Sequence, residues 1–141
     1  MTTFDAVTKI AKSKPSKKVR VLRELKIGQA IQQGDVYLHR VPDDFPHAEQ
    51  IGEESVQVAL GTSNGARHMA EGEVKVFKGV KLPDGVKAPM DVQAAEIIGP
   101  LVIASKTWTL SHTEHPHHRL PKGAYQVTYQ YDPITMRRVQ D

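Results

Sequence analysis

Histidines are concentrated in one short segment, where four of the seven in the chain lie in His112-Thr-Glu114-His115-Pro-His117-His118. Imidazole gains and loses a proton near neutral pH, so such a cluster can supply a general acid or base. Imidazole and carboxylate groups together are also the usual ligands of divalent transition metals. The segment therefore predicts either acid–base chemistry or a metal site formed by His112, Glu114 and His115.

A second candidate element is the turn that ends in Arg67 and His68. An arginine guanidinium binds phosphate or carboxylate through two parallel hydrogen bonds, so Arg67 could hold an anionic substrate while His68 acts as acid or base. If the fold brings these two residues to His112 and His115, the four would form a catalytic site for phosphodiester chemistry. His68 could also replace Glu114 as a third metal ligand. The alternative interpretation is an exposed polar loop whose histidines are solvated.

Strands are the elements expected to position these side chains. After Gly34, short runs rich in Val, Ile, Tyr and Thr are separated by Gly, Pro, Asp and Asn, which is typical of an antiparallel β protein. A hairpin of the last two long strands would carry the histidine segment at its connection. The predicted fold is mainly β, a small antiparallel barrel or sandwich over residues 34–141. We expect strands at 35–41, 55–60, 73–77, 96–104, 106–112, 124–131 and 137–139, with turns at 61–65 and 82–85.

The N-terminal part, residues 1–33, is predicted to be a basic, partly helical arm. Residues 1–27 carry eight basic and two acidic side chains, a charge of +6, whereas the rest of the chain carries −3. Apolar spacing favours helices at 4–13 and 16–26, although alternation at 19–25 also allows a strand. A basic arm attracts nucleic acid or an acidic protein surface, and the alternative is a solvated tail. The residues expected to make the contact are Lys14, Lys17, Lys18, Arg20 and Arg23.

Composition excludes several classes of protein. The chain has 141 residues, which fits one compact domain plus an appendage. It has no cysteine, and this excludes disulfide scaffolds, cysteine–zinc fingers, iron–sulfur clusters and thiol nucleophiles. The longest apolar run is much shorter than a membrane span, and no apolar segment follows the basic N-terminus as in a secretory signal. A cytoplasmic protein without membrane contact is expected.

Two stretches resemble small uncharacterised bacterial and phage proteins that are rich in β structure. The first is Asn64-Gly-Ala-Arg-His68 followed by 71–77, and the second is Leu110-Ser-His-Thr-Glu-His115 followed by 120–130. Such proteins often also carry a strand that begins like Gln33-Gly-Asp-Val36. The resemblance covers the body after residue 29 and implies that the Arg-His turn and the His-x-Glu-His hairpin belong to one site, without implying an activity.

Two functions remain open at this stage. The first is a binding or assembly module that contacts nucleic acid or an acidic partner through the arm and self-associates into a homo-oligomer. The second is an enzyme that uses the His/Glu cluster, with a divalent transition metal or through acid–base groups alone. The distance between His68 and His112 in the folded chain discriminates between them.

Overall fold

A computed structural model describes residues 19–60, 67–132 and 137–138, and within them the chain is mainly β-sheet. The helical content of that part is one turn of 3-10 helix, and no helix there is long and apolar enough to cross a membrane. The elements are β3 (Val19–Val21), β4 (Ala30–Gln33), β5 (Val36–Val41), β6 (His47–Leu60), β7 (Arg67–Gly79), η1 (Ala94–Glu96), β8 (Ile98–Ala104), β9 (Trp108–His112), β10 (His117–Leu120), β11 (Gly123–Tyr129), β12 (Tyr131–Asp132) and β13 (Arg137–Arg138).

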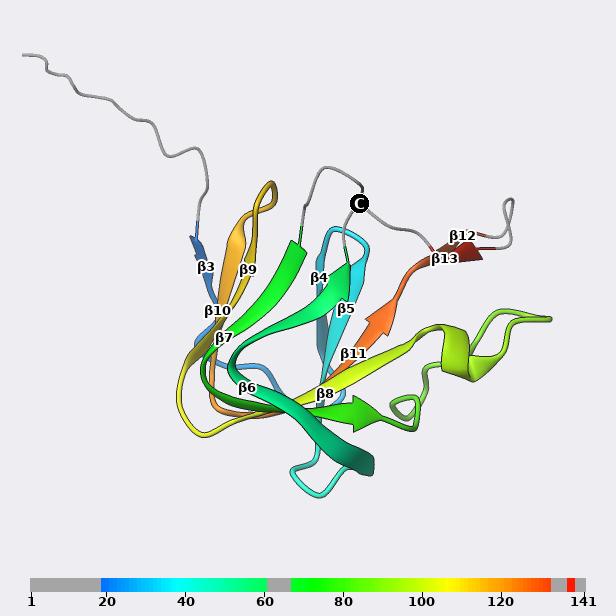
Figure 1. The fold of residues 1–141 in the computed structure, drawn as a ribbon, viewed down its shortest axis with the longest axis horizontal. Coiled ribbons are helices and arrows are strands. Elements are labelled where there is room, and N and C mark those ends of the chain that lie inside the picture. Colours follow the sequence, from blue (N-terminus) through cyan, green and yellow to red (C-terminus); the bar gives the residue numbers. More distant parts are fainter. Residues whose placement is uncertain (1–18, 61–66, 133–136, 139–141) are drawn as a thin grey trace, which may run out of the picture.

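One curled sheet contains nine of these strands. Its order is β3-β10-β9-β7-β8-β11-β5-β4, and β6 pairs with the remaining edge of β7. The long strand β7 pairs with β9 through residues 68–71 and with β8 through residues 74–77. Between the two pairings Gly72 has φ +127°, and a Cβ there would lie 3.4 Å from Trp108 Cα, so this position requires glycine. The result is a half-barrel with β3, β10 and β9 on one side and β11, β5 and β4 on the other (Figure 1).

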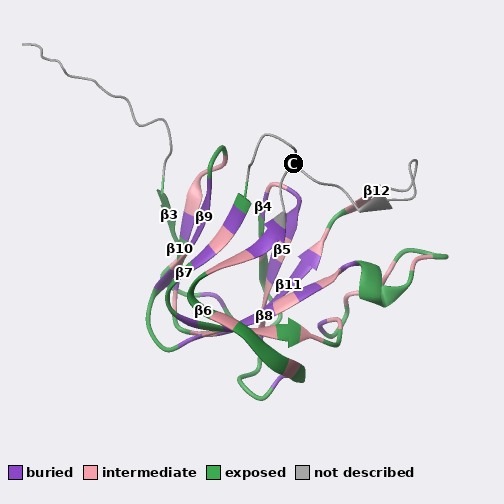
Figure 2. Cartoon of the chain, viewed as in Figure 1, coloured by how far each residue is buried: buried purple, intermediate pink, exposed green. Residues whose placement is uncertain are grey.

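The main core fills the inside of the half-barrel. Trp108 and Tyr125 are fully buried and pack edge-on, with ring centroids 5.3 Å apart. Alternate residues of the central strands also point into this core, including Leu38 of β5 and Leu110 of β9. A smaller apolar cluster around Phe45 and Leu101 lies apart from this core. Burial is therefore concentrated in the central strands, whereas β3 and most of β4 are exposed (Figure 2).

The prediction of a mainly β body is confirmed, and the sheet is an open, curled half-barrel. Strands lie at or near most of the predicted positions, and β6 and β7 are longer than expected. Both β3 and β4 belong to this sheet although they precede the expected boundary at residues 33/34. The helix expected at 4–13 and the turn at 61–65 lie outside the described residues.

Two local predictions are wrong. Residues 19–21 of the predicted helix 16–26 form strand β3 instead, because their backbone finds hydrogen-bonding partners in β10 and β-branched Val19 and Val21 suit an extended chain. The strand at 106–112 also does not pair with the strand at 124–131. Instead β9 lies between β10 and β7, while β11 lies between β5 and β8. The histidine segment is therefore the end of β9, the turn and the start of β10 in the β9–β10 hairpin.

Candidate functional site

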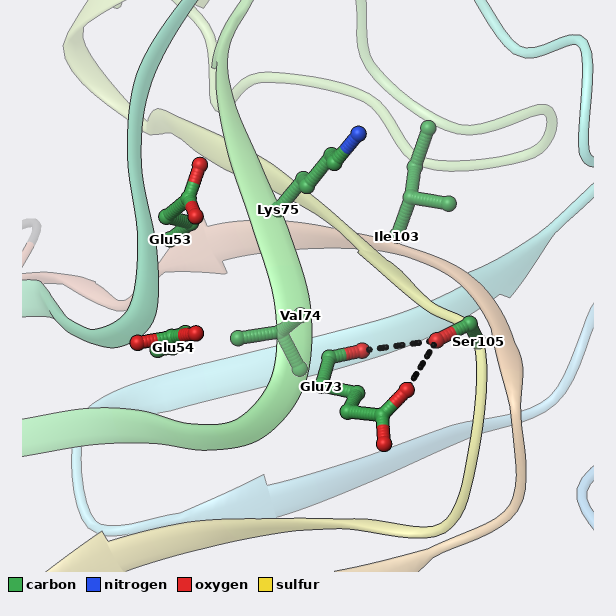
Figure 3. A pocket seen from close by; sticks show the side chains of 7 residues that line it. All are labelled: Glu53, Glu54, Glu73, Val74, Lys75, Ile103 and Ser105. Atoms are coloured by element: carbon green, nitrogen blue, oxygen red, sulfur yellow. Dashed lines mark hydrogen bonds between the residues drawn. The ribbon is translucent and has the colours of Figure 1, made fainter.

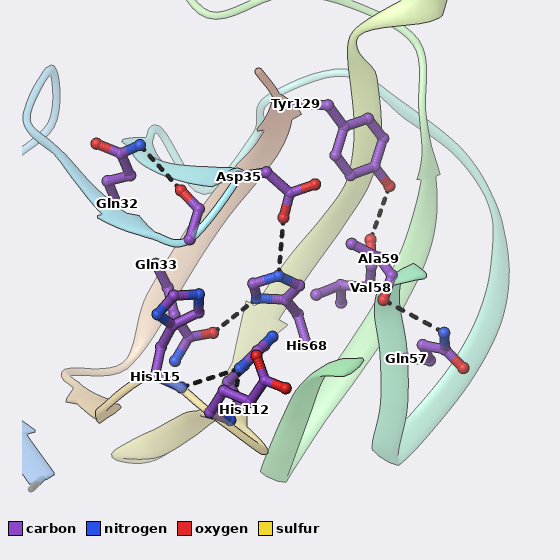
Figure 4. A network of polar contacts seen from close by, with 12 residues as sticks. Gln32, Gln33, Asp35, Gln57, Val58, Ala59, His68, His112, His115 and Tyr129 are labelled. Carbon is purple, nitrogen blue, oxygen red and sulfur yellow. Dashed lines mark hydrogen bonds and ion pairs between the residues drawn. The ribbon is translucent and has the colours of Figure 1, made fainter. Parts of the chain in front are cut away.

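A fully buried polar network surrounds His68 at one end of the half-barrel (Figure 4). The imidazole Nδ1 lies 2.9 Å from Gln33 Oε1, and Nε2 lies 3.0 Å from Asp35 Oδ1. Gln33 and Asp35 flank Gly34, whose φ of +58° forms the turn between β4 and β5. The tight turn thus directs two polar side chains, from the β4–β5 side of the half-barrel, toward one histidine of β7.

Hydrogen-bond roles fix the protons of this network. Gln33 Nε2 donates to the carbonyl oxygens of Leu110 at 3.0 Å and Pro116 at 2.9 Å, which leaves Oε1 as the acceptor that faces His68. His68 Nδ1 must therefore carry a proton. A further proton lies between Nε2 and Asp35, so the imidazole and carboxyl groups form an ion pair or its neutral equivalent. A lone carboxylate beside a neutral ring is thereby avoided in a site with no exposed surface.

His112 and His115 extend the cluster from the adjacent strand. His112 is the register partner of His68, and the two ring centroids are 4.3 Å apart. The His115 ring lies 4.5 Å from that of His112. His112 Nδ1 accepts hydrogen bonds from the backbone N–H groups of Glu114 at 2.9 Å and His115 at 3.0 Å, so that nitrogen carries no proton. The structure thus brings together the three histidines grouped from the sequence.

The chemistry open to this cluster is limited by the contacts it already makes. Both ring nitrogens of His68 and the Nδ1 of His112 form hydrogen bonds with protein groups. Among the described residues, no group of three or more His, Asp or Glu side chains is arranged to hold a metal ion. The Glu114 side chain is exposed, whereas His68 and His112 are buried. In this arrangement His68 serves to position the turn and the neighbouring rings.

Arg67 lies on the opposite face of the sheet from His68, because successive side chains of a strand alternate. It lines a depression of about 450 Å³ on the outer surface of β7 and β9. There the Ser111 hydroxyl donates to a carboxylate oxygen of Glu71. His117 Nε2 donates to the His112 carbonyl 3.0 Å away. The structure therefore places Arg67 with the Ser111–Glu71 pair, while its chain neighbour His68 faces the interior.

The described end of the basic arm lies against the histidine hairpin. Strand β3 pairs with β10 in parallel, and Arg20 is the register partner of His118. Both residues line a depression of about 260 Å³. The other described residues of its lining are Gln32, Gln33, Gly34, His115 and Pro116, so none of the seven is acidic. His118 is only 4% exposed, and within the described ranges its Nδ1 has no hydrogen-bond partner. Burial lowers the pKa of His118, and the positive charges of Arg20 and His117 lower it further.

Only two of the five predicted arm contacts fall within the described residues. Arg20 and Arg23 are exposed, and neither forms an ion pair with an acidic side chain of the described part of the chain. Lys14, Lys17 and Lys18 lie outside it. The two arginines thus supply uncompensated positive charge directly beside β10.

Negative charge gathers in a different depression, of about 390 Å³, over β6 and β7 (Figure 3). Glu53, Glu54 and Glu73 line it together with one cation, Lys75. Ser105 Oγ donates to Glu73 Oε1 at 3.2 Å, and Lys106 lies 3.3 Å from the other carboxylate oxygen. The linings of the two depressions therefore differ in charge: three glutamates and one lysine here, and Arg20 without an acidic residue beside β3 and β10.

Comparison with known proteins gives one match. A family model described as Domain of unknown function (DUF8820) matches residues 32–130. The matched region contains the His68 network and the whole histidine hairpin, and it excludes β3 with Arg20 and Arg23. No curated protein and no solved structure matches the chain.

Sequence reasoning missed Gln33, Asp35 and His118 as site residues. Gln33-Gly-Asp-Val36 stood out only as part of a resemblance. A predicted strand–turn–strand unit does not indicate which distant histidine the side chains of Gln33 and Asp35 contact. His118 was visible as a member of the cluster. Its position beside Arg20 follows from the pairing of β10 with β3, and no local sequence pattern predicts that pairing.

Proposed function

The chain belongs to the DUF8820 family, and we propose that this member is a nucleic-acid-binding module whose contact surface runs from the basic arm across β3 and β10. One observation carries the proposal: the parallel pairing of β3 with β10. This pairing joins the last cations of the arm to the histidine hairpin, although about a hundred residues separate the two in sequence. Two features that looked like rival sites in the sequence thus lie side by side where β3 pairs with β10.

The charge of that surface supports a phosphate-rich partner. Residues 19–23 and 117–122 contain Arg20, Arg23, Arg119 and Lys122 and no acidic residue. The arm adds the remaining cations that give residues 1–27 their charge of +6. Binding through counterion release needs many dispersed cations, and the surface carries them next to the exposed valines Val19 and Val21 of β3. An acidic protein partner needs a more defined, better packed interface, so we rank it second.

The test is a charge reversal compared with a matched reversal elsewhere. Lys17, Lys18 and Arg23 are changed to Glu in one variant, and the exposed body residues Lys75, Lys78 and Lys87 in the other, so that both lose the same net charge. Binding of a fluorescent oligonucleotide is measured by anisotropy between about 50 and 200 mM salt. The arm variant should bind at least about tenfold more weakly, with a log–log salt slope reduced by about 2 to 3.

Equal losses in both variants would show that only net charge matters and would overturn the proposal. Binding of an acidic protein with no oligonucleotide binding at low salt would replace nucleic acid by the second-ranked partner. Light scattering on the same samples tests self-association. In such an assembly the basic arm of one copy would bind the acidic depression of another, at Glu53, Glu54 and Glu73.

A second candidate function is acid–base or metal-dependent chemistry at His68, His112 and His115. The observation that favours it is the packing of the three rings, at centroid distances of 4.3 and 4.5 Å. Metal analysis of protein purified without a histidine tag is the first test. About one equivalent of metal, with loss of thermal stability on chelation, would support a metal centre. Substoichiometric metal together with unchanged stability would eliminate the metal-dependent version.

Cleavage of an oligonucleotide tests the version without metal. Activity that is lost in His112→Ala and His115→Ala but retained in Lys87→Ala, an exposed residue outside the proposed contact surface, would support an acid–base role. Binding without cleavage would leave the binding module as the function.

A further inference from the structure

The depression between β3, β10 and the β4–β5 turn has a lining suited to anions. Its residues are Arg20, Gln32, Gln33, Gly34, His115, Pro116 and His118, and none of them is acidic. Arg20 is exposed and makes no ion pair within the described part of the chain, so its guanidinium donors face solvent. The recess is therefore positively charged and not neutralised by its own walls.

The second observation is the state of His118. The ring is buried to 4% exposure, and its Nδ1 has no hydrogen-bond partner among the residues that the structure describes. Leaving a buried polar atom unpaired costs free energy, and native proteins rarely do so without a functional reason. The pairing register places Arg20 on the same face as His118, so a guanidinium and an imidazole line one recess side by side. This combination recognises an oxyanion, because both groups donate hydrogen bonds and one is permanently charged.

We propose that this recess is a phosphate-binding pocket in which Arg20 and His118 hold the phosphate oxygens. Gln32, whose amide Nε2 donates to the Gly34 carbonyl at 2.9 Å, forms part of the rim. That the phosphate belongs to a nucleic acid rests on the function proposed above, whereas the pocket itself rests on its lining. The volume of about 260 Å³ exceeds that of a single phosphate, so a terminal phosphate group can enter together with part of its sugar.

Inorganic phosphate is the first probe. Full-length protein labelled with ¹⁵N is titrated with phosphate, and with chloride at the same ionic strength as a control. Saturable shifts of the Arg20, His118 and Gly34 amides, seen with phosphate and not with chloride, are the expected result. No shift at these three residues up to about 50 mM phosphate, a concentration at which a millimolar site would be saturated, would overturn the pocket.

Matched variants locate the contact. Arg20→Gln and His118→Leu each remove one proposed donor, and Arg23→Gln removes a nearby arginine that does not line the recess. We expect the first two to weaken phosphate binding at least about tenfold and the third to change it less than about twofold. Equal effects of Arg20→Gln and Arg23→Gln would reduce the pocket to general electrostatics and overturn it.

Oligonucleotides with and without a 5′-phosphate separate the sources of the phosphate. Tighter binding of the phosphorylated strand, lost in Arg20→Gln, assigns the pocket to a terminal phosphate. Equal binding of both strands that is still weakened in Arg20→Gln and not in Arg23→Gln assigns it to the backbone. Phosphate shifts without any oligonucleotide binding would retain the pocket and overturn the proposed function. Oligonucleotide binding that depends on the arm lysines, with no amide shifts on addition of phosphate, would retain the proposed function and overturn the pocket.

Discussion

Two histidines that face the same side of the sheet, His68 on β7 and His118 on β10, have opposite surroundings. Each ring nitrogen of His68 is held by a protein group, and the side chain has no exposed surface. His118 is almost as buried, yet its Nδ1 has no partner in the described part of the chain, and an arginine lies beside it at the edge of a recess. The comparison separates a histidine that holds the fold together from one that is available to a ligand, and residue type and burial alone would not have distinguished them.

The largest expected effect is the difference between His68→Leu and His118→Leu. His68→Leu removes the ring that pairs with the buried Asp35 carboxyl group, and it should lower the free energy of unfolding by about 3 to 5 kcal/mol. His118→Leu removes a ring that makes no such pair, and it should cost less than about 1 kcal/mol. Urea unfolding followed by fluorescence of Trp108 measures both. Similar losses would break the distinction between the two histidines.

The protonation of His68 offers an independent check on the same comparison. Its hydrogen bonds place a proton on Nδ1 and a second proton between Nε2 and Asp35. The ¹⁵N shift of Nδ1 should therefore be that of a protonated ring nitrogen, because that nitrogen donates to Gln33 Oε1. A ring with one unprotonated nitrogen beside an ionised Asp35 would show that the network is arranged differently.

An intermediate effect is expected at Gln33, a side chain that takes part in both regions. Its Oε1 faces His68, its Nε2 bridges the Leu110 and Pro116 carbonyls, and it also lines the recess. Gln33→Ala should cost about 2 to 3 kcal/mol, because it leaves buried groups unpaired. It should also weaken phosphate binding, because the bridge to Pro116 fixes the histidine turn.

Its exposed neighbour provides the control. Gln32→Ala removes only an exposed hydrogen bond to the Gly34 carbonyl, so it should cost less than about 0.5 kcal/mol. If Gln33→Ala destabilises the protein without changing phosphate binding, the two regions are energetically independent.

The smallest effect is the loss of stability in acid. Burial lowers the pKa of both His39 and His118 from the ordinary value of 6.5. The unfolded chain therefore takes up protons at these sites before the folded chain does, and stability should fall as the pH decreases below about 6.5. His118→Leu and His39→Leu should each reduce the difference in unfolding free energy between about pH 7.5 and pH 5. An acid loss in both variants as large as in the unaltered protein would contradict this.

Phosphate sharpens that last measurement. A ligand that binds only the folded state raises stability, and an anion beside His118 favours its protonated form. Added phosphate should therefore reduce the acid loss in the unaltered protein and in His39→Leu, but much less in His118→Leu.

The body of the fold could be predicted because its signals are local. Alternation in 35–41, 73–77 and 124–131 reports which residues enter the core, and those segments form β5, part of β7 and β11. Pairing is not local, and sequence order suggested that the strand at 106–112 pairs with the strand at 124–131. The four-residue connection before β10 makes a nearer hairpin, so β9 pairs there instead. Arm residues 19–21 were ambiguous for the same reason, because only β10 decides between helix and strand.

The candidate site was predictable only in part. The grouping of His68 with His112 and His115 came from residue type and resemblance, and the rings do meet. Their partners Gln33 and Asp35 come from a turn on the far side of the half-barrel, so their role depends on curvature. Curvature follows from features such as Gly72, whose conformational role cannot be recognised without its neighbour Trp108.

Strand β3 also protects a sheet edge. It covers the outer side of β10 through only three register pairs, helped by the Leu22 N–H bond to the Arg119 carbonyl at 2.8 Å. Proteolytic clipping after Arg23 would remove this cover and bare a row of main-chain donors and acceptors. Such an edge recruits a strand from another molecule, so the trimmed protein should assemble by strand addition to β10.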